Sequence, residues 1–251
     1  MGRSGIVNDE YSERLRALRA EPSRDAARDP ARLRRVGLTR EEMLGQARAI
    51  ETTLAAEAPA LDALAATIGG RGFDHVVVLG CGDSWFVGMG VRHALESLTG
   101  RPVIAAQALD FAAYDHRGTN ARGLVLGLSA GGNTPAVMQA LRAAKRRGAL
   151  TVGLSNTPET PILTEFDVGL RIHASRRGWP TQSSTAAMAL LVALGLRLAT
   201  DSARAGEIAA ALAGTPALID RTLAATDGAA FGELVKIAQN ALQAKVAAAK
   251  A

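Results

Sequence analysis

Short, continuous apolar segments alternate with helical patterns along the middle of this 251-residue chain. His75–Gly80 is β-branched and bounded by Asp and Gly, which is typical of a strand buried on both faces of a parallel sheet. Helical patterns are clearest at 85–98 and 135–147. Further strand-like segments lie at 103–108, 124–129, 150–155 and 168–173. The alternation predicts an α/β fold: a doubly wound, five-stranded parallel sheet in the flavodoxin-like order 2-1-3-4-5, flanked by helices and carrying N- and C-terminal helical extensions.

A helical segment is expected ahead of the first strand. Thr39 and Glu42 form a capping-box signature, and an apolar stripe at spacings of three and four follows it as far as Ile68. The pattern predicts a break near Pro59 and an end at Gly69-Gly70. With one apolar face, this segment must pack on the rest of the domain.

Alanine-rich helical segments are expected after the last strand. They cover 184–198, 206–225 and the stretch from Phe231 to the end, because alanine is the best helix former. The expected organisation is a basic, mixed-charge N-terminal extension at 1–38, a domain with its leading helix at 39–200, and Ala-rich C-terminal helices at 201–251.

The net charge of +5 comes mainly from the first 40 residues, which hold ten Arg and six acidic residues. The rest of the chain carries 19 basic and 18 acidic residues and is nearly neutral. A mixed-charge leader is typical of a solvated extension, so we expect no nucleic-acid partner. With one Cys, no run of 18 apolar residues and no secretory leader, we expect a cytoplasmic protein without a membrane association.

Glycines and short polar residues follow the first expected strand, at the end where parallel sheets bind ligands. Gly82, Asp83 and Ser84 lead directly into a helix, whose free N–H groups favour a phosphate or another anion. The alternative is a tight turn capped by Asp83 or Ser84. Trp85 stands where a dinucleotide fingerprint has its third glycine, so we expect no dinucleotide and no other cofactor.

A second loop of this kind follows the third expected strand. It contains Ser129, Gly131, Gly132, Asn133 and Thr134. Short polar side chains around a glycine pair suit a compact anion. In a 2-1-3-4-5 order the first and third strands are neighbours that flank the point where strand order reverses, so the two loops support each other as one site.

The loop after the fifth expected strand is both basic and rich in hydroxyls. Arg176 and Arg177 can supply positive charge, and Ser183 and Ser184 can present hydroxyls to the same crevice. An exposed basic turn followed by a helix N-cap is the alternative interpretation.

Three segments together resemble the sugar isomerase (SIS) domain over about residues 40–200. The matching segments are Gly80-Cys-Gly-Asp-Ser84, Ser129-Ala-Gly-Gly-Asn-Thr134 and Gly153-Leu-Ser-Asn156. The resemblance implies binding of a phosphorylated sugar or amino sugar, with phosphate-binding hydroxyls at Ser84, Ser129 and Thr134.

Within the family, the segments at 43–50 and 180–190 are most similar to the isomerase half of glucosamine-fructose-6-phosphate aminotransferase and its double-SIS relatives. This similarity implies an isomerase that interconverts aldose and ketose phosphates, or an amino-sugar-phosphate deaminase. The sequence also departs from these relatives. Gly131 replaces a phosphate-contacting serine, Arg177 replaces a glutamate, and Ser183-Ser184 replace Thr-Lys. An arginine in place of an acid predicts a more anionic ligand.

A catalytic base is harder to assign, because relatives carry much of their catalytic machinery in a second SIS half that is not expected here. Enolisation of a sugar phosphate needs a base near the C1 or C2 proton. His116 is the candidate, with a surface or capping histidine as the alternative. No metal site is expected.

Two functions therefore stay open at the sequence level. The first is a phosphosugar isomerase or amino-sugar-phosphate deaminase, and the second is a non-catalytic module that senses a phosphosugar. Residues 39–69 show no helix-turn-helix, which disfavours a DNA-binding sensor. A homodimer is expected, with the Ala-rich helices as contact surface.

Overall fold

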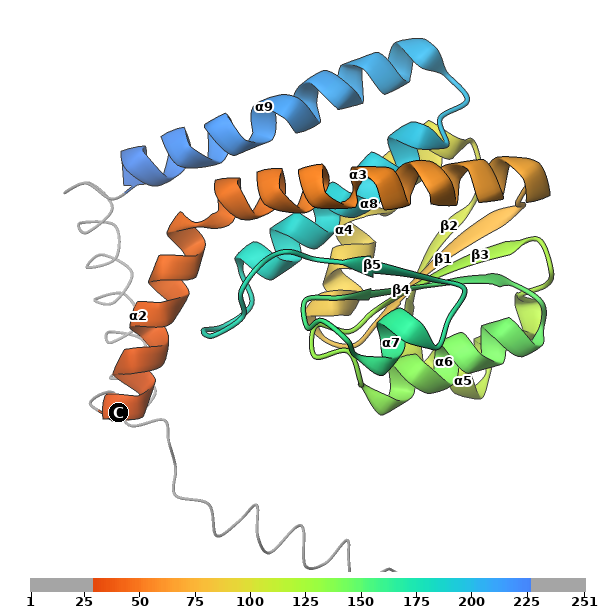
Figure 1. Ribbon diagram of the computed structural model, residues 1–251, viewed down its shortest axis with the longest axis horizontal. Coiled ribbons are helices and arrows are strands. Elements are labelled where there is room, and N and C mark those ends of the chain that lie inside the picture. The colour runs from red at the N-terminus through yellow and green to blue at the C-terminus, as the bar shows by residue number, and fades with distance from the viewer. Residues whose placement is uncertain (1–28, 227–251) are drawn as a thin grey trace, which may run out of the picture.

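A computed structural model describes residues 29–226 of the chain. Figure 1 shows this part as a sheet between helices, with two long helices at its periphery. The strands are β1 (His75–Gly80), β2 (Val103–Gln107), β3 (Gly123–Leu128), β4 (Leu150–Ser155) and β5 (Val168–Arg171). The helices are α2 (Pro30–Leu44), α3 (Gln46–Arg71), α4 (Asp83–Thr99), α5 (Ala108–Ala113), the 3-10 turn η1 (Asp115–Gly118), α6 (Pro135–Arg146), α7 (Pro161–Thr164), α8 (Gln182–Arg197) and α9 (Ser202–Thr226).

The five strands run parallel in the order β2-β1-β3-β4-β5, which confirms the fold class expected from the sequence. Every residue of β3 and β4 is buried, as central strands between two helical layers require. Strand order reverses between β1 and β3 at the carboxyl edge of the sheet. An α/β sheet of this kind binds its ligands at that edge.

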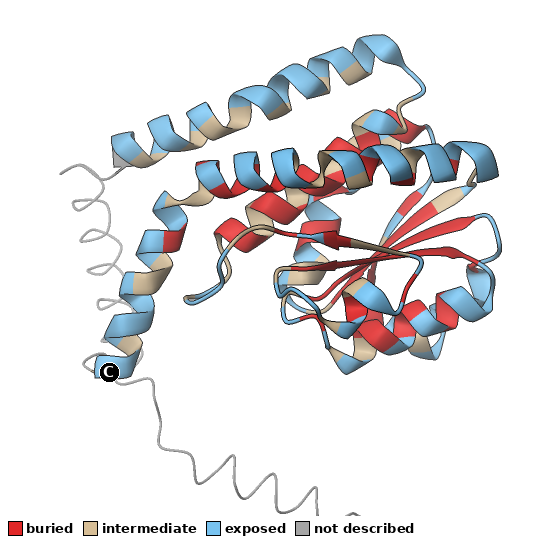
Figure 2. Ribbon diagram, in the orientation of Figure 1, coloured by how far each residue is buried: buried red, intermediate tan, exposed pale blue. Residues whose placement is uncertain are grey.

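Helices cover both faces of the sheet (Figure 1). One core joins the sheet to α3, α4 and α8, and the other joins it to α5, α6 and α7. Side chains of β1 alternate between them: Val76 and Val78 enter the first core, and Val77 and Leu79 enter the second. Figure 2 shows buried residues along the strands and on the inner faces of these helices. The carboxyl edge of the sheet is therefore held by rigid elements from both layers.

The first described helix begins earlier than the capping signature predicts. Asp29 caps α2 by accepting a hydrogen bond from the backbone N–H of Ala31 at 2.9 Å, and Pro30 suits the first helical position. Thr39 lies inside the helix, where its hydroxyl donates to the carbonyl oxygen of Arg35 at 2.8 Å. The expectation that Thr39 begins the helix is wrong, because Asp29 and Pro30 supply a start signal upstream.

The break between the two N-terminal helices lies at Gly45 and not near Pro59. α3 continues through Pro59, because its buried face packs against α8 along its length and compensates for the missing N–H. At Gly45 a side chain would meet Gln182, with the Cβ position 2.9 Å from Oε1. Figure 1 shows α2 turning away from α3 at this point.

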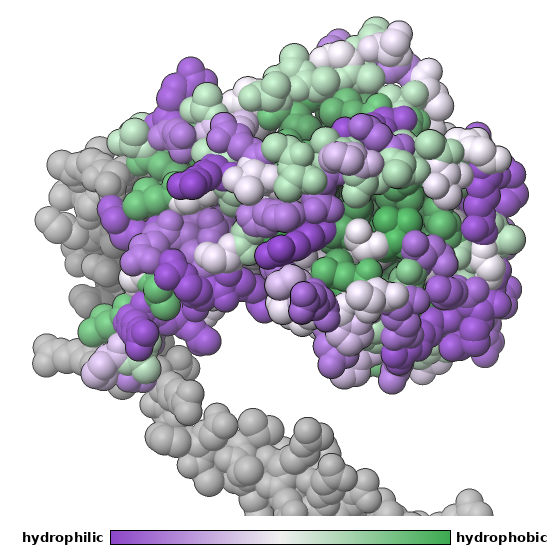
Figure 3. All heavy atoms as spheres, in the orientation of Figure 1, coloured by the Kyte–Doolittle hydropathy of each residue, from purple (hydrophilic) through white to green (hydrophobic). Residues whose placement is uncertain are grey.

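The last described helix, α9, lies outermost and packs on α3. Leu212 and Ile219 contact the core, while most of its other residues are exposed. In Figure 3 apolar surface runs along α9 and α3 at the top of the view, and hydrophilic residues gather around α6. By length and composition alone, α9 is long and apolar enough to cross a membrane, but one such helix is weak evidence for a membrane protein. The expected absence of a membrane association stays a prediction. The helix expected from Phe231 onward lies outside the described residues.

Candidate functional site

A small pocket, open to solvent, lies at the carboxyl edge of the sheet. Segments that follow four of the strands line it, as expected for a parallel α/β sheet. Its polar lining residues are Asp83 and Ser84 after β1, Ser129 after β3, Asn156 after β4, and Arg176, Ser183 and Ser184 after β5. The structure thus brings together six of the residues that the sequence singled out for a site: Asp83, Ser84, Ser129, Arg176, Ser183 and Ser184.

Two helix N-termini contribute to this pocket. Asp83 and Ser84 belong to the first turn of α4, and Ser183 and Ser184 to the first turn of α8. Neither helix has a side-chain hydrogen bond at its N-cap residue. The backbone N–H groups of Ser84 and Ser184 donate to the carbonyl oxygens of Cys81 and Thr181, so only the earlier N–H groups of each first turn face a ligand unpaired. Helix N-termini favour negative charge, and Arg176, which also lines the pocket, adds a positive charge. The pocket therefore suits an anion.

The loop after β3 reaches the pocket only through its first residues, Ser129 and Ala130. The Ser129 hydroxyl lies 2.8 Å from the Thr134 hydroxyl and accepts a hydrogen bond from the Thr134 backbone N–H at 3.2 Å. The two hydroxyls are thus hydrogen-bonded to each other at the start of α6. Gly131 and Asn133 are exposed and Gly132 is buried, and none of the three is among the residues that line the pocket.

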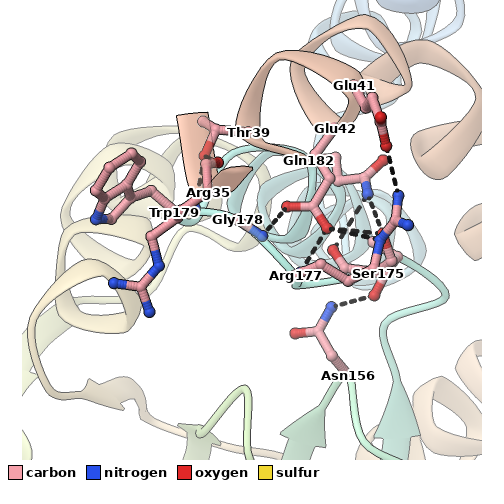
Figure 4. A network of polar contacts seen from close by, with 11 residues as sticks. Arg35, Thr39, Glu41, Glu42, Asn156, Ser175, Arg177, Gly178, Trp179 and Gln182 are labelled. Carbon is pink, nitrogen blue, oxygen red and sulfur yellow. Dashed lines mark hydrogen bonds and ion pairs between the residues drawn. The ribbon is translucent and has the colours of Figure 1, made fainter. Parts of the chain in front are cut away.

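The two neighbouring arginines differ in their surroundings. Arg176 lines the pocket, whereas the Arg177 guanidinium donates to the Glu41 carboxylate at 3.0 Å (Figure 4). The sequence pointed to both arginines as sources of charge and to Arg177 as a binding residue, but only Arg176 is among the lining residues. On the pocket side, the Asn156 side-chain amide donates to the carbonyl oxygen of Ala174 at 3.0 Å and ties the end of β4 to the same loop.

Three residues at or beside the pocket carry only a weak signal in the sequence: Asn156, Arg176 and the buried Glu42. Asn156 carried a signal, since it ends one of the segments that resemble the SIS domain. The sequence favoured Arg176 and Arg177 equally as sources of positive charge, because charge alone does not distinguish two adjacent arginines. Glu42 appeared only as part of a capping box, and nothing in the local sequence indicates its burial.

The expected base does not join this cluster. His116 lies in η1, where its Nδ1 is 3.2 Å from the carbonyl oxygen of Phe111, and it does not line the pocket. The chain beyond it leads to Thr119, whose side chain lies beside Gly123 at the amino end of β3. His116 thus lies on a segment that leads away from the carboxyl edge, and its catalytic role stays a prediction.

Cys81 sits next to the pocket turn as a half-buried residue. Burial raises the pKa of its thiol, an effect that the backbone N–H of Ala108 only partly offsets. A neutral thiol is a poor nucleophile. Within residues 29–226, no group of three or more His, Cys, Asp or Glu side chains could hold a metal ion.

The pattern of the SIS domain family matches residues 72–197, which is half of the chain. The chain belongs to the SIS domain family. This match covers β1 to α8, the segments that build the sheet and its pocket. It begins after α2 and α3, which lie on the N-terminal side of the matched region.

Relatives of this SIS domain include glutamine-fructose-6-phosphate aminotransferases. The Aquifex aeolicus protein is 28% identical over 207 residues, which cover 82% of this chain and 33% of the relative. The second Mus musculus aminotransferase is 36% identical over 155 residues, which cover 59% of this chain and 22% of the relative. The chain therefore spans a third or less of these proteins.

A solved structure supports the fold independently. The structure of a candidate phosphosugar isomerase from Clostridium difficile matches with a TM-score of 0.63 and 19% identity. The match covers 74% of this chain and 53% of that chain. At this identity the likeness shows a shared fold.

Proposed function

We propose that this SIS domain binds a phosphorylated sugar or amino sugar in the pocket at the carboxyl edge of the sheet. The observation that carries the proposal is the convergence of the Arg176 guanidinium with the first turns of α4 and α8. The phosphate would lie against these positive groups, because a dianion gains most from a cation and oriented N–H donors. The Asp83 carboxylate and the side-chain oxygen of Asn156 would accept hydrogen bonds from the sugar hydroxyls.

We further propose that the bound sugar undergoes isomerase- or deaminase-type chemistry. The isomerizing aminotransferases among the relatives support this proposal, and so does the presence of a carboxylate in the pocket lining. Among the described residues that line the pocket, Asp83 is the one carboxylate and the candidate to exchange a proton with C1 or C2. A module that senses the phosphosugar without turnover is the second candidate, and the position of His116 outside the pocket favours it.

The two arginines test where the anion binds. Arg176→Gln should weaken binding of fructose 6-phosphate at least about tenfold, since it removes a charge-assisted contact. Arg177→Gln should change the dissociation constant by less than about threefold, because Arg177 pairs with the exposed Glu41. Isothermal titration calorimetry measures both, with unphosphorylated fructose as the matched ligand control. Equal losses in the two variants would count against the assigned pocket.

Turnover separates the two candidate functions. An NMR assay should show that the wild-type protein converts fructose 6-phosphate to an aldose 6-phosphate, or hydrolyses glucosamine 6-phosphate to fructose 6-phosphate and ammonia. Asp83→Asn should abolish this turnover while leaving binding in place. Binding without turnover in the wild-type protein would support the sensing module.

A further inference from the structure

A buried carboxylate lies outside the pocket, on α2. Glu42 is 2% exposed, yet it is a charged residue on a helix that is otherwise mostly solvent-exposed. A buried charge is costly unless hydrogen bonds compensate it. Glu42 accepts three: from the Ser175 hydroxyl at 2.8 Å, from the backbone N–H of Arg177 at 2.6 Å and from that of Gly178 at 3.2 Å. All three donors belong to the loop that follows β5 (Figure 4).

Further contacts join the same loop to α2 and to the start of α8. The Gln182 side-chain amide donates to the Ser175 hydroxyl at 2.7 Å, and the Trp179 backbone N–H donates to the Thr39 hydroxyl at 2.9 Å. Gly178 packs so closely on α2 that a Cβ there would overlap Thr39. The loop from Ser175 to Trp179, which we call the arginine loop, is therefore held along its whole length.

Of the four residues from Ser175 to Gly178, Arg176 alone makes no hydrogen bond to Glu42. Its neighbours on either side, Ser175 and Arg177, both donate to the same carboxylate, which fixes the backbone around Arg176. The Arg177 side chain reaches α2, where it meets Glu41, whereas Arg176 lines the pocket.

We propose that Glu42 is a positioning residue that holds the arginine loop so that Arg176 faces the pocket. The proposal rests on the proposed function, because it assigns Arg176 to the anion. It makes α2, which precedes the region matched by the family pattern, a working part of the site. Glu42 itself does not line the pocket and acts through the loop backbone.

Limited trypsin digestion tests the loop without any ligand. Glu42→Gln replaces an acceptor oxygen with an NH₂ group that cannot accept from the loop N–H donors, so cleavage after Arg176 and Arg177 should become about tenfold faster. Mass spectrometry locates the cuts. Glu41→Gln is the matched control on the adjacent, exposed residue and should leave the rate of cleavage after Arg176 unchanged. Unchanged cleavage in the folded Glu42→Gln protein would overturn the proposal.

A double-mutant cycle tests the link to Arg176. Glu42→Gln should weaken fructose 6-phosphate binding at least about fivefold in the wild-type background and cause no further loss in the Arg176→Gln background. A loss of the same size in both backgrounds would overturn the positioning role.

If the wild-type protein binds no phosphosugar, the proposed function fails, while the digestion still decides whether Glu42 holds the loop. If Glu42→Gln does not fold by circular dichroism, Ser175→Ala, which removes one of the three bonds, takes its place in both experiments.

Discussion

At the scale of single residues, two adjacent glycines in the loop after β3 have opposite surroundings. Gly131 is exposed, and a Cβ built there meets nothing within 4 Å. Gly132 has a φ of 73°, and a Cβ there would overlap the Thr160 side chain. The resemblance of this segment to the SIS domain implies a phosphate-contacting serine at the position of Gly131. The missing hydroxyl is therefore a feature of this chain that its backbone does not require.

We expect Gly131→Ser to fold normally and to change the dissociation constant of fructose 6-phosphate by less than about threefold, because Gly131 does not line the pocket. Gly132→Ser is the matched control. It should lower the free energy of unfolding by about 1–3 kcal/mol, since serine is strained at positive φ. Calorimetry and urea unfolding measure the two effects. Markedly tighter binding by Gly131→Ser would place the phosphate against this loop and contradict the assigned pocket.

The carboxyl groups of Glu42 and Asp167 make the free energy of unfolding depend on pH. Burial alone would raise the pKa of Glu42, but hydrogen bonds from Arg177, Ser175 and Gly178 and the nearby Arg177 charge lower it below the ordinary 4.5. Burial acts in the same way on Asp167, and hydrogen bonds from Thr151 and the Lys145 ammonium group lower its pKa below 3.8. A carboxyl with a lowered pKa in the folded protein stabilises the fold when it is ionised.

The free energy of unfolding should therefore hold steady above about pH 5 and fall as the pH drops through the two lowered pKa values. Urea unfolding from pH 6 to pH 2.5 measures this. Glu42→Gln should show a shallower fall than the wild-type protein, and Glu41→Gln the same fall as the wild-type protein. Parallel curves for the wild-type protein and Glu42→Gln would contradict a lowered pKa at Glu42.

At the scale of elements, the strands could be predicted from the sequence because their signal is local. A continuous apolar segment bounded by turn residues suffices for β1, β3 and β4, since both faces of each strand are buried. The start of α2 could not be predicted, because the sequence holds two capping signals and Asp29, not Thr39, caps the helix. The direction of Arg176 depends on Glu42, which lies more than 130 residues away in sequence.

The helical layer around α8 should contribute much of the stability. Leu190 of α8 is fully buried, and Leu190→Ala should lower the free energy of unfolding by about 2–5 kcal/mol through the cavity it leaves. Leu109 of α5 is 55% exposed, and Leu109→Ala should change the free energy of unfolding by less than about 0.5 kcal/mol. Chemical denaturation compares the two variants. Equal losses would contradict the expected role of the α8 layer.

At the scale of the whole molecule, the pocket is formed by four strand ends and two helix N-termini within one SIS domain. α9 presents a long, alanine-rich outer face beyond it. We propose that two copies associate through this face and that the protein works in the cytoplasm. Apolar surface of this kind is typical of a protein interface.

Light scattering measures the assembly. A homodimer predicts twice the 26.0 kDa of the chain, and Leu218→Asp should shift the population towards the monomer because it places a charge in the interface. A mass near that of a single chain at micromolar concentration would contradict the proposed dimer.

The position of a bound phosphosugar tests the central claim most directly. A crystal structure of the protein soaked with fructose 6-phosphate should show the phosphate within hydrogen-bond distance of the Arg176 guanidinium and of the first turns of α4 and α8. The sugar should extend towards Asp83 and Asn156. A phosphate bound anywhere else on the chain, with this pocket left to solvent, would contradict the account.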